Sequence, residues 1–191
     1  ERMAFGLGPG NEKKLAMARR VYELSQIQDL PSECPIQPSF RHLCNILQIN
    51  EGDIDKAKEF YKEQIKNTRD ERRILERSIC ALNWLKEYAP QEFKFAVNKQ
   101  APKVDLTRES NKFLSLLESY LSENQTSIKS DKELHEKMYE FIHEVEGLEP
   151  ALAFQTLYQI LISQSKGPKL AGFIRTIGVN KVTSLIKQCL K

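Results

Sequence analysis

The sequence predicts an all-α protein, a helical bundle of about eight helices, on three observations. Apolar residues recur at intervals of three and four over most of the chain, which is the spacing of one helix face. Capping residues precede these runs and Gly or Pro follows them. The only alternating stretch lies near residues 93–97, where we expect at most a brief extended segment. The 191 residues suffice for one full domain or two small ones.

Residues 1–12 are expected to form a linker or the tail of a preceding region. The run from Gly6 to Gly10 contains three glycines and Pro9, which is too many turn residues for a regular element. It superficially resembles a phosphate-binding glycine loop, but no apolar strand precedes it and Pro9 lacks an amide donor. The first helix is therefore expected to begin at Lys13 and to end before Pro31.

Three helices are expected between Pro38 and Tyr88. Pro38 suits the first turn of one helix, and Asp53 suits the N-cap of the next. The third and longest should run from about Thr68 to Tyr88, about 30 Å. Its apolar residues are expected to face inward: Leu75, Ile79, Leu82 and Leu85.

Four more helices are expected after a boundary near Pro102. Ser130 and Glu133 have the spacing of a capping box, and Gly147 would end that helix. Pro150 should open the next helix, which Gly167-Pro168 would interrupt. Short helices over about 169–176 and 180–190 complete the prediction.

The charge distribution is uneven. The formal net charge is only +3, yet residues 109–149 hold ten acidic and four basic residues. Residues 150–191 hold six basic residues and no acidic one. Such a stretch creates a local positive potential, which predicts an anionic partner larger than a metabolite.

No catalytic or metal-binding constellation is found in the sequence. The four cysteines have no C-x-x-C spacing, which favours reduced thiols over a zinc site, and the sequon at Asn124 is interpreted as chance. His135 and His143 are eight residues apart, so they are interpreted as solvated surface residues of a helix. No window approaches 18 uncharged apolar residues, so no contact with a membrane is expected.

Three arginines stand four residues apart on the long predicted helix, at Arg69, Arg73 and Arg77. Such a stripe could hold successive phosphates, because guanidinium groups match phosphate oxygens. An equally good interpretation is a solvated helix surface, with these arginines paired to neighbouring carboxylates. The carboxylates available are Asp70, Glu71 and Glu76.

Elsewhere basic residues stand next to rings. Unpaired RNA loops are recognised by such pairs, with bases stacked on aromatic or Arg planes and cations on phosphates. Phe95 and Phe173 fit a hydrophobic core as well, and Trp84 is expected in the core. The candidate RNA contacts outside the arginine stripe are Arg41, Lys94, Lys166, Lys169, Phe173 and Arg175.

Three blocks give the chain a family likeness. The blocks Pro35–Leu43 (PIQPSFRHL), Cys80–Phe95 (CALNWLKEYAPQEFKF) and Gly167–Ile174 (GPKLAGFI) resemble the C-terminal part of class I lysyl-tRNA synthetases, in order and at matching separations. The likeness covers nearly the whole chain. The family usually has a second glycine directly after the leucine of the last block, whereas this sequence has Ala171 and then Gly172.

The resemblance implies an α-helix cage that receives the anticodon stem-loop of a lysine tRNA. Residues 13–102 would join the cage to a catalytic part, and residues 103–191 would form the C-terminal anticodon-binding subdomain. The intact family attaches lysine to tRNA with ATP and Mg²⁺, but its H-I-G-H-like and K-M-S-K-S-like signatures do not occur here. No catalysis and no bound cofactor are therefore expected of this chain alone.

The first residue, Glu1, is not a methionine and no leader follows it, so we expect a piece of a longer cytoplasmic protein. A monomer that does not bind DNA is also expected. The alternative function is a helical scaffold for protein interactions, in which the basic C-terminal face meets an acidic protein and RNA plays no part.

Overall fold

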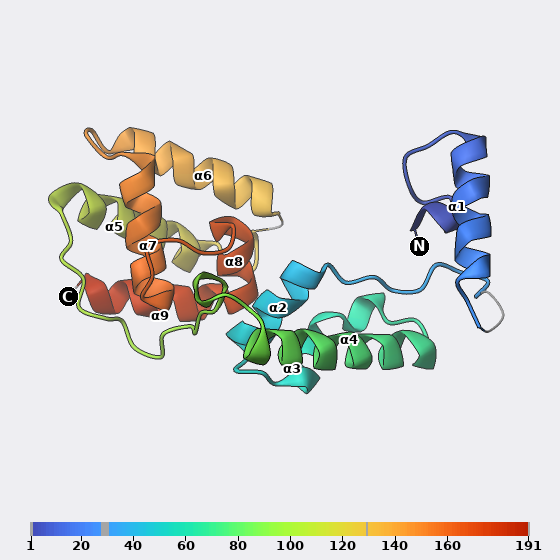
Figure 1. Ribbon diagram of the computed structural model, residues 1–191. Coiled ribbons are helices and arrows are strands. Elements are labelled where there is room, and N and C mark those ends of the chain that lie inside the picture. The colour runs from blue at the N-terminus through green and yellow to red at the C-terminus, as the bar shows by residue number, and fades with distance from the viewer. Residues whose placement is uncertain (1, 28–30, 129, 191) are drawn as a thin grey trace.

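The structure is a computed structural model, and it describes residues 2–27, 31–128 and 130–190 (Figure 1). Lys129 and Lys191, which contribute to the charge pattern above, lie outside these residues. Within the described part the chain forms nine α-helices and no strand, which confirms the all-α prediction. The helices are α1 Glu12–Leu24, α2 Phe40–Ile49, α3 Ile54–Phe60, α4 Thr68–Glu87, α5 Arg108–Glu123, α6 Asp131–Glu144, α7 Pro150–Ile162, α8 Leu170–Ile177 and α9 Val179–Cys189. Three short 3-10 helices, Arg2–Phe5, Lys62–Gln64 and Gln91–Phe93, complete the described elements.

Three of the predicted helix starts are confirmed. The side chain of Asp53 accepts a hydrogen bond from the amide of Lys56, 3.1 Å away. That of Ser130 accepts one from the amide of Glu133, also at 3.1 Å. Pro150 is the first residue of α7, where its missing N–H costs no helical hydrogen bond.

Three details of the prediction are wrong. Pro38 is not in the first turn of its helix, because Ser39 is the N-cap and α2 begins at Phe40. The helix α5 is not among the eight expected helices, although Thr107 caps it and its apolar residues have helical spacing.

On α4 the inward face differs from the predicted one in the first half of the helix. Ile74 is fully buried, while Leu75 and Ile79 are 39% and 43% exposed; Leu85 is buried, as predicted. The helices α2 and α3 pack against one side of α4. The residues buried on that side include Ile74, Ser78, Ala81 and Leu85.

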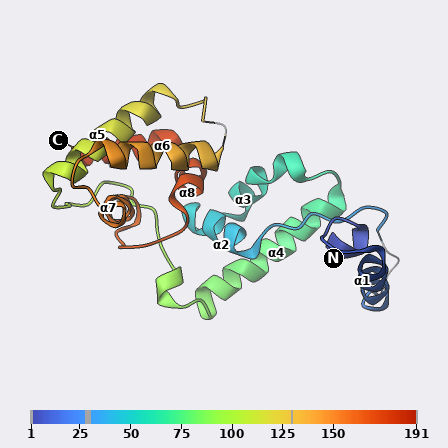
Figure 2. The ribbon, with the colours of Figure 1, turned by 90° about the horizontal axis from the view of Figure 1, so that it is seen from above.

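The helices pack around two separate hydrophobic cores. One core lies between α2, α3 and α4 and includes Leu43, Ile46 and Ile74. The other is larger and joins α5 to α9 around Phe113, Leu117 and Leu157. In Figures 1 and 2 the two groups of helices lie side by side, with α2 next to α8.

Residues 94–107 form the crossing between the two cores, and they are extended without forming a strand. The amide of Phe95 donates to the side chain of Gln48 on α2, at 2.8 Å. Three residues later along the crossing the amide of Asn98 donates to the carbonyl of Leu161 on α7, at 2.8 Å. The crossing is thus hydrogen-bonded to both groups of helices and fixes α2 relative to α7.

The N-terminal helix α1 stands apart from both cores (Figures 1 and 2). It contacts the short helix Arg2–Phe5 and has no buried residue. Met17, Val21 and Leu24 are between 59% and 71% exposed. As predicted, the glycine-rich run between the two contains no regular element. Among the described helices, none has both the length and the hydropathy required to cross a bilayer.

Candidate nucleic-acid interface

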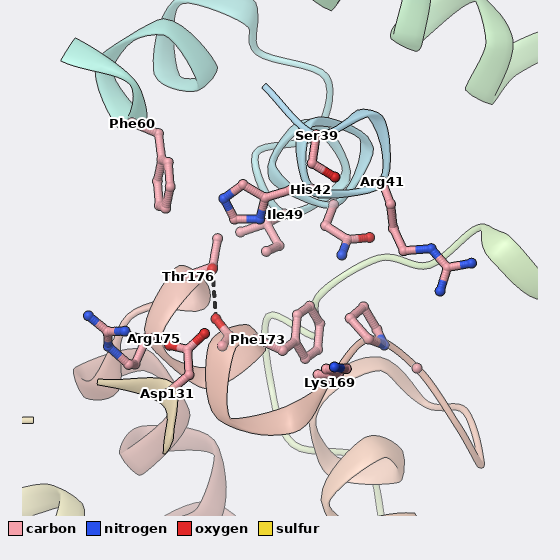
Figure 3. Close-up of a pocket in the computed structure, with 14 residues that line it drawn as sticks. Ser39, Arg41, His42, Ile49, Phe60, Asp131, Lys169, Phe173, Arg175 and Thr176 are labelled. Atoms are coloured by element: carbon pink, nitrogen blue, oxygen red, sulfur yellow. Dashed lines mark hydrogen bonds and ion pairs between the residues drawn. The ribbon is translucent and has the colours of Figure 1, made fainter. Parts of the chain in front are cut away.

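A cavity of about 640 Å³ opens where the two groups of helices meet (Figure 3). One wall comes from α2 and the end of α3, and the opposite wall comes from α8 and the loop before it. On α2 the residues Leu43, Cys44, Ile46 and Leu47 are buried in the core, so the other face of the helix is directed to the cavity. On α8 the buried residues are Leu170, Ala171, Phe173 and Ile174, which leaves Gly172, Arg175 and Thr176 toward the cavity.

Three cations and one carboxylate line this cavity. Arg41 comes from α2, Lys169 from the residue that precedes α8, and Arg175 from the last turn of α8. The carboxylate is that of Asp131, the first residue of α6, which forms an ion pair with the guanidinium of Arg175. Both partners remain partly exposed, so this ion pair contributes little stability but orients the guanidinium.

The pair between Asp131 and Arg175 depends on Gly172. A Cβ atom added at Gly172 would lie 2.7 Å from Oδ2 of Asp131, closer than real contacts allow. Glycine at this position therefore lets the carboxylate lie directly against α8. The resembled family usually has its second glycine at the position of Ala171. In this sequence the glycine is Gly172, where α8 meets the first residue of α6.

Aromatic side chains form the wall opposite Arg175. The ring of Phe60, at the end of α3, is 46% exposed and points toward the cavity (Figure 3). Its centroid is 5.4 Å from that of His42 on α2, in an edge-to-face arrangement. Behind them Tyr61 is buried, and burial raises its pKa to about 12. The cavity therefore offers an exposed ring and three cations to one ligand.

His42 is neutral in this environment near pH 7. Partial burial of the imidazole lowers its pKa below the usual value, and the carboxylate of Asp131 raises it by a smaller amount. A polyanion in the cavity would favour the charged imidazolium and so raise the pKa.

A second cavity of about 360 Å³ adjoins the first. The two share Arg41, Asn45 and the turn Gly167-Pro168, whose Pro168 carbonyl accepts a hydrogen bond of 2.6 Å from the hydroxyl of Tyr158. The guanidinium of Arg41 lies over the ring of Phe93, 5.8 Å from its centroid. The second cavity adds two rings and one further cation, namely Phe93, Phe95 and Lys166.

The structure thus brings together five of the nine candidate residues named from the sequence. Arg41, Lys166, Lys169, Phe173 and Arg175 line these two adjoining cavities. The ring of Phe173 is only 3% exposed and packs edge-to-face on Phe95, with centroids 5.2 Å apart. That burial agrees with the core interpretation of Phe173 and leaves no open face for stacking.

The remaining four candidates lie elsewhere. The ammonium group of Lys94 donates to the carbonyl of Lys86 near the end of α4, at 3.2 Å. The other three, Arg69, Arg73 and Arg77, lie on α4 and line neither cavity. Arg73 is half-buried, and its Nε donates to the carbonyl of Ile36, 3.1 Å away. That contact agrees with a structural role for Arg73.

The carboxylates near the α4 arginines have partners as well. Asp70 is 5% exposed and accepts hydrogen bonds from the amides of Ile36 and Lys66, at 3.2 and 3.1 Å. Glu71 pairs with Lys58 and Glu76 pairs with Arg72, each at 2.8 Å. The N-terminal half of α4 is therefore held in a network that fixes the segment before α2.

Two functional candidates of the cavities were not identified from the sequence, Phe60 and Asn45. Phe60 and Tyr61 are neighbours at the end of α3, and spacing alone does not tell which of two neighbouring rings is buried. Asn45 stands between buried residues of α2, where an amide carries no sequence signal of its own.

No metal-binding group is found among the described residues, where no three His, Cys, Asp or Glu side chains lie close enough to share an ion. His135 and His143 are exposed on α6, as expected. All four cysteines are free, which agrees with the interpretation as thiols.

Comparison with known proteins supports the resemblance stated for the sequence. No protein-family model matches the chain. The lysine–tRNA ligase of Borrelia garinii subsp. bavariensis is 34% identical over 98% of the chain, and that of Treponema pallidum is 35% identical over 97%. An archaeal lysine–tRNA ligase, from Methanosphaera stadtmanae, is 33% identical over 93% of the chain.

The chain spans only about a third of the length of these relatives, 35% or 36%. The relatives come from spirochetes and archaea, which agrees with the class I type of the family. Over nearly its whole length the chain is therefore a relative of the lysine–tRNA ligases, and it corresponds to their C-terminal part.

Proposed function

We propose that this chain binds the anticodon stem-loop of a lysine tRNA and positions that tRNA for ATP-dependent lysylation. Catalysis belongs, in this proposal, to the part of the lysine–tRNA ligases that the chain does not match. The observation that carries the proposal is the cavity between α2 and α8, where one exposed ring faces three cations.

The side chains of this cavity suit an unpaired RNA loop. An exposed ring such as Phe60 can stack on a base, and guanidinium and ammonium groups can hold the phosphates on either side. The cavity is open and about 640 Å³ in volume, within the range of about 300–1,000 Å³ that is common for ligand sites. A regular duplex would keep its bases stacked inside, away from such a ring.

The H-I-G-H-like and K-M-S-K-S-like signatures with which the resembled family holds ATP do not occur in the sequence. The proposed contribution of this chain is therefore to hold the tRNA, and no step of lysine activation is assigned to it.

The remaining expectations belong to the same proposal. Residues 13–102 would connect the catalytic part to the anticodon-binding subdomain at 103–191, and residues 1–12 would be a linker. A cytoplasmic location, a monomeric state and no contact with DNA or membranes complete it. Of the two groups of cations, we propose those of the cavities as the principal RNA contacts, with Arg69, Arg73, Arg77 and Lys94 as secondary ones.

The test is a titration of the 191-residue chain with the anticodon stem-loop of a lysine tRNA over a series of salt concentrations. For single strands, each phosphate that a cation neutralises contributes about −0.7 to the slope of log K against log salt. If the three cavity cations each neutralise one phosphate, the slope should be about −2. The control is a hairpin whose loop bases are paired into the stem, which should bind at least about ten-fold more weakly. Absent binding, or binding indifferent to salt, would contradict the proposal.

A further inference from the structure

Among the residues that the structure describes, Asn45 is the one polar, uncharged side chain that lines both cavities. We propose that the two adjoining cavities hold two consecutive unpaired nucleotides and that the Asn45 amide recognises the edge of a base there. This inference rests on the proposed function, which it deepens from binding of an RNA loop to recognition of its sequence.

The hydrogen bonding of Asn45 sets it apart. Four asparagines of the described residues are half-buried. Asn50, Asn98 and Asn124 each donate from their amide to a backbone carbonyl, at 2.9 to 3.0 Å. Within the described part of the chain, Asn45 makes no hydrogen bond through its side chain. The buried side-chain atoms without a partner among the described residues do not include the amide of Asn45, so this amide is open to the cavities and available to a ligand.

The position of Asn45 is rigid. It stands on α2 between Cys44 and Ile46, which are both fully buried in the core of α2, α3 and α4. It follows Arg41 by four residues, so the two side chains lie on one face of the helix, one turn apart. The helix therefore fixes the backbone position from which the amide of Asn45 reaches the cavities.

An amide has the chemistry to recognise a base edge. It offers one acceptor and two donors, and a base edge presents a matching pair of groups. Cations hold phosphates equally well in every sequence, whereas a hydrogen bond to a base edge depends on which base is present. Asn45 would therefore supply sequence discrimination, and the surrounding cations would supply affinity.

The arrangement of the two cavities fits two nucleotides rather than one. Each cavity has its own rings, with Phe60 and His42 in the first and Phe93 and Phe95 in the second. Each also has its own lysine, Lys169 or Lys166, while Arg41 lies between them. Bases in neighbouring cavities would place the phosphate that joins them near the guanidinium of Arg41.

The experiment measures the binding of the 191-residue chain and its Asn45→Ala variant to a set of RNA hairpins. The set contains the anticodon stem-loop of a lysine tRNA and versions in which each loop base is replaced in turn. The matched control is Asn83→Ala, which removes an exposed asparagine from α4 that lines neither cavity. Thermal melting confirms that both variants fold.

We expect replacement of either of two adjacent loop bases to weaken binding to the unmodified chain by about ten-fold. In Asn45→Ala that penalty should fall to about two-fold for at least one of the two, with an unchanged salt slope, while Asn83→Ala retains the full discrimination. A variant Asn45→Ala that keeps the full penalty at both positions would overturn the inference and leave the proposed function standing. If the unmodified chain binds none of the hairpins, the proposed function fails and the inference fails with it.

Discussion

The molecule has two groups of basic residues, one on α4 and one around the cavities, and they differ in what surrounds them. The α4 group, Arg69, Arg73 and Arg77, is regular in sequence and lies on one helix. The cavity group, Arg41, Lys169 and Arg175, comes from segments up to 134 residues apart and shows no spacing at all. Only the second group shares a concave surface with an exposed ring.

The difference follows from what each helix packs against. The first turn of α4 lies beside the segment before α2, where Asp70 and Arg73 hydrogen-bond to the backbone of Ile36. The cavity forms where two separately packed groups of helices meet, and cations from both reach it. Regular spacing thus identifies neighbours on a helix, whereas a binding surface depends on which helices are brought together.

The largest effect is expected from removing the cavity cations together. The triple substitution Arg41→Ala, Lys169→Ala and Arg175→Ala should weaken binding of the anticodon stem-loop by about 100-fold and reduce the salt slope by about 2. The measurement is a fluorescence titration at several salt concentrations. The matched control is Arg69→Ala, Arg72→Ala and Lys86→Ala, which removes three cations from α4 and should cost less than about five-fold. Equal losses of affinity in the two triple variants would show that cations on α4 hold the RNA as well as those of the cavity do.

The next effect concerns the contact between α6 and α8. Gly172→Ala should lower the free energy of unfolding by no more than about 1 kcal/mol, because the added methyl group displaces the exposed end of the Asp131 side chain and breaks its ion pair with Arg175. Chemical denaturation measures this loss. In an Asp131→Ala background the ion pair is already absent, so Gly172→Ala should cause no further loss. A further loss in that background would show that Gly172 matters for another reason.

An effect on stability of similar size is expected at Arg73. Arg73→Ala removes the hydrogen bond to the carbonyl of Ile36 and should lower the free energy of unfolding by about 1 kcal/mol. That corresponds to a drop of about 2–4 °C in Tm for a chain of this size. RNA affinity should change by less than about three-fold. A variant that melts normally but loses RNA affinity would move Arg73 into the binding group.

The smallest effect is a dependence of RNA binding on pH. Burial holds the pKa of His42 below its usual value, so the imidazole is neutral in the free protein near pH 7. Phosphates in the cavity would raise that pKa, so binding would take up a proton and affinity would rise as the pH falls.

Burial is the larger influence on the pKa of His42 and lowers it, while the carboxylate of Asp131 raises it by a smaller amount. The increase in affinity should be about three-fold between about pH 7.5 and about pH 5.5. It should be absent in His42→Gln, and isothermal titration at both pH values would measure it. An undiminished increase in His42→Gln would assign the proton to another group.

Much of the fold could be predicted because helix ends are determined locally. Asp53, Ser130 and Pro150 begin their helices as their side chains predict. Which face of α4 is buried was harder to predict from the sequence. Ile74 and Leu75 are both apolar, and which of them is buried depends on where α2 and α3 lie. Local chemistry therefore locates the helices, and their packing decides which residues are buried.

The candidate site could be predicted only in part from the sequence, for the same reason. Arg41, Lys169 and Arg175 could be named because they carry charge in segments with a family likeness. Their meeting with Phe60 required the contact between α2 and α8, which no local pattern encodes. The proposed role of Asn45 depends on its side-chain amide having no hydrogen-bond partner among the described residues. The sequence does not show which amides have partners, so this feature needs the structure.

The most direct test of the central claim is to titrate the chain with the anticodon stem-loop of a lysine tRNA and record which backbone amide signals shift by NMR. If the loop binds between α2 and α8, signals should shift over Ser39–Asn45, at Phe60 and over Gly167–Thr176, with little change over Arg69–Arg77. Shifts concentrated along Arg69–Arg77, with the residues around the two cavities unaffected, would contradict this claim.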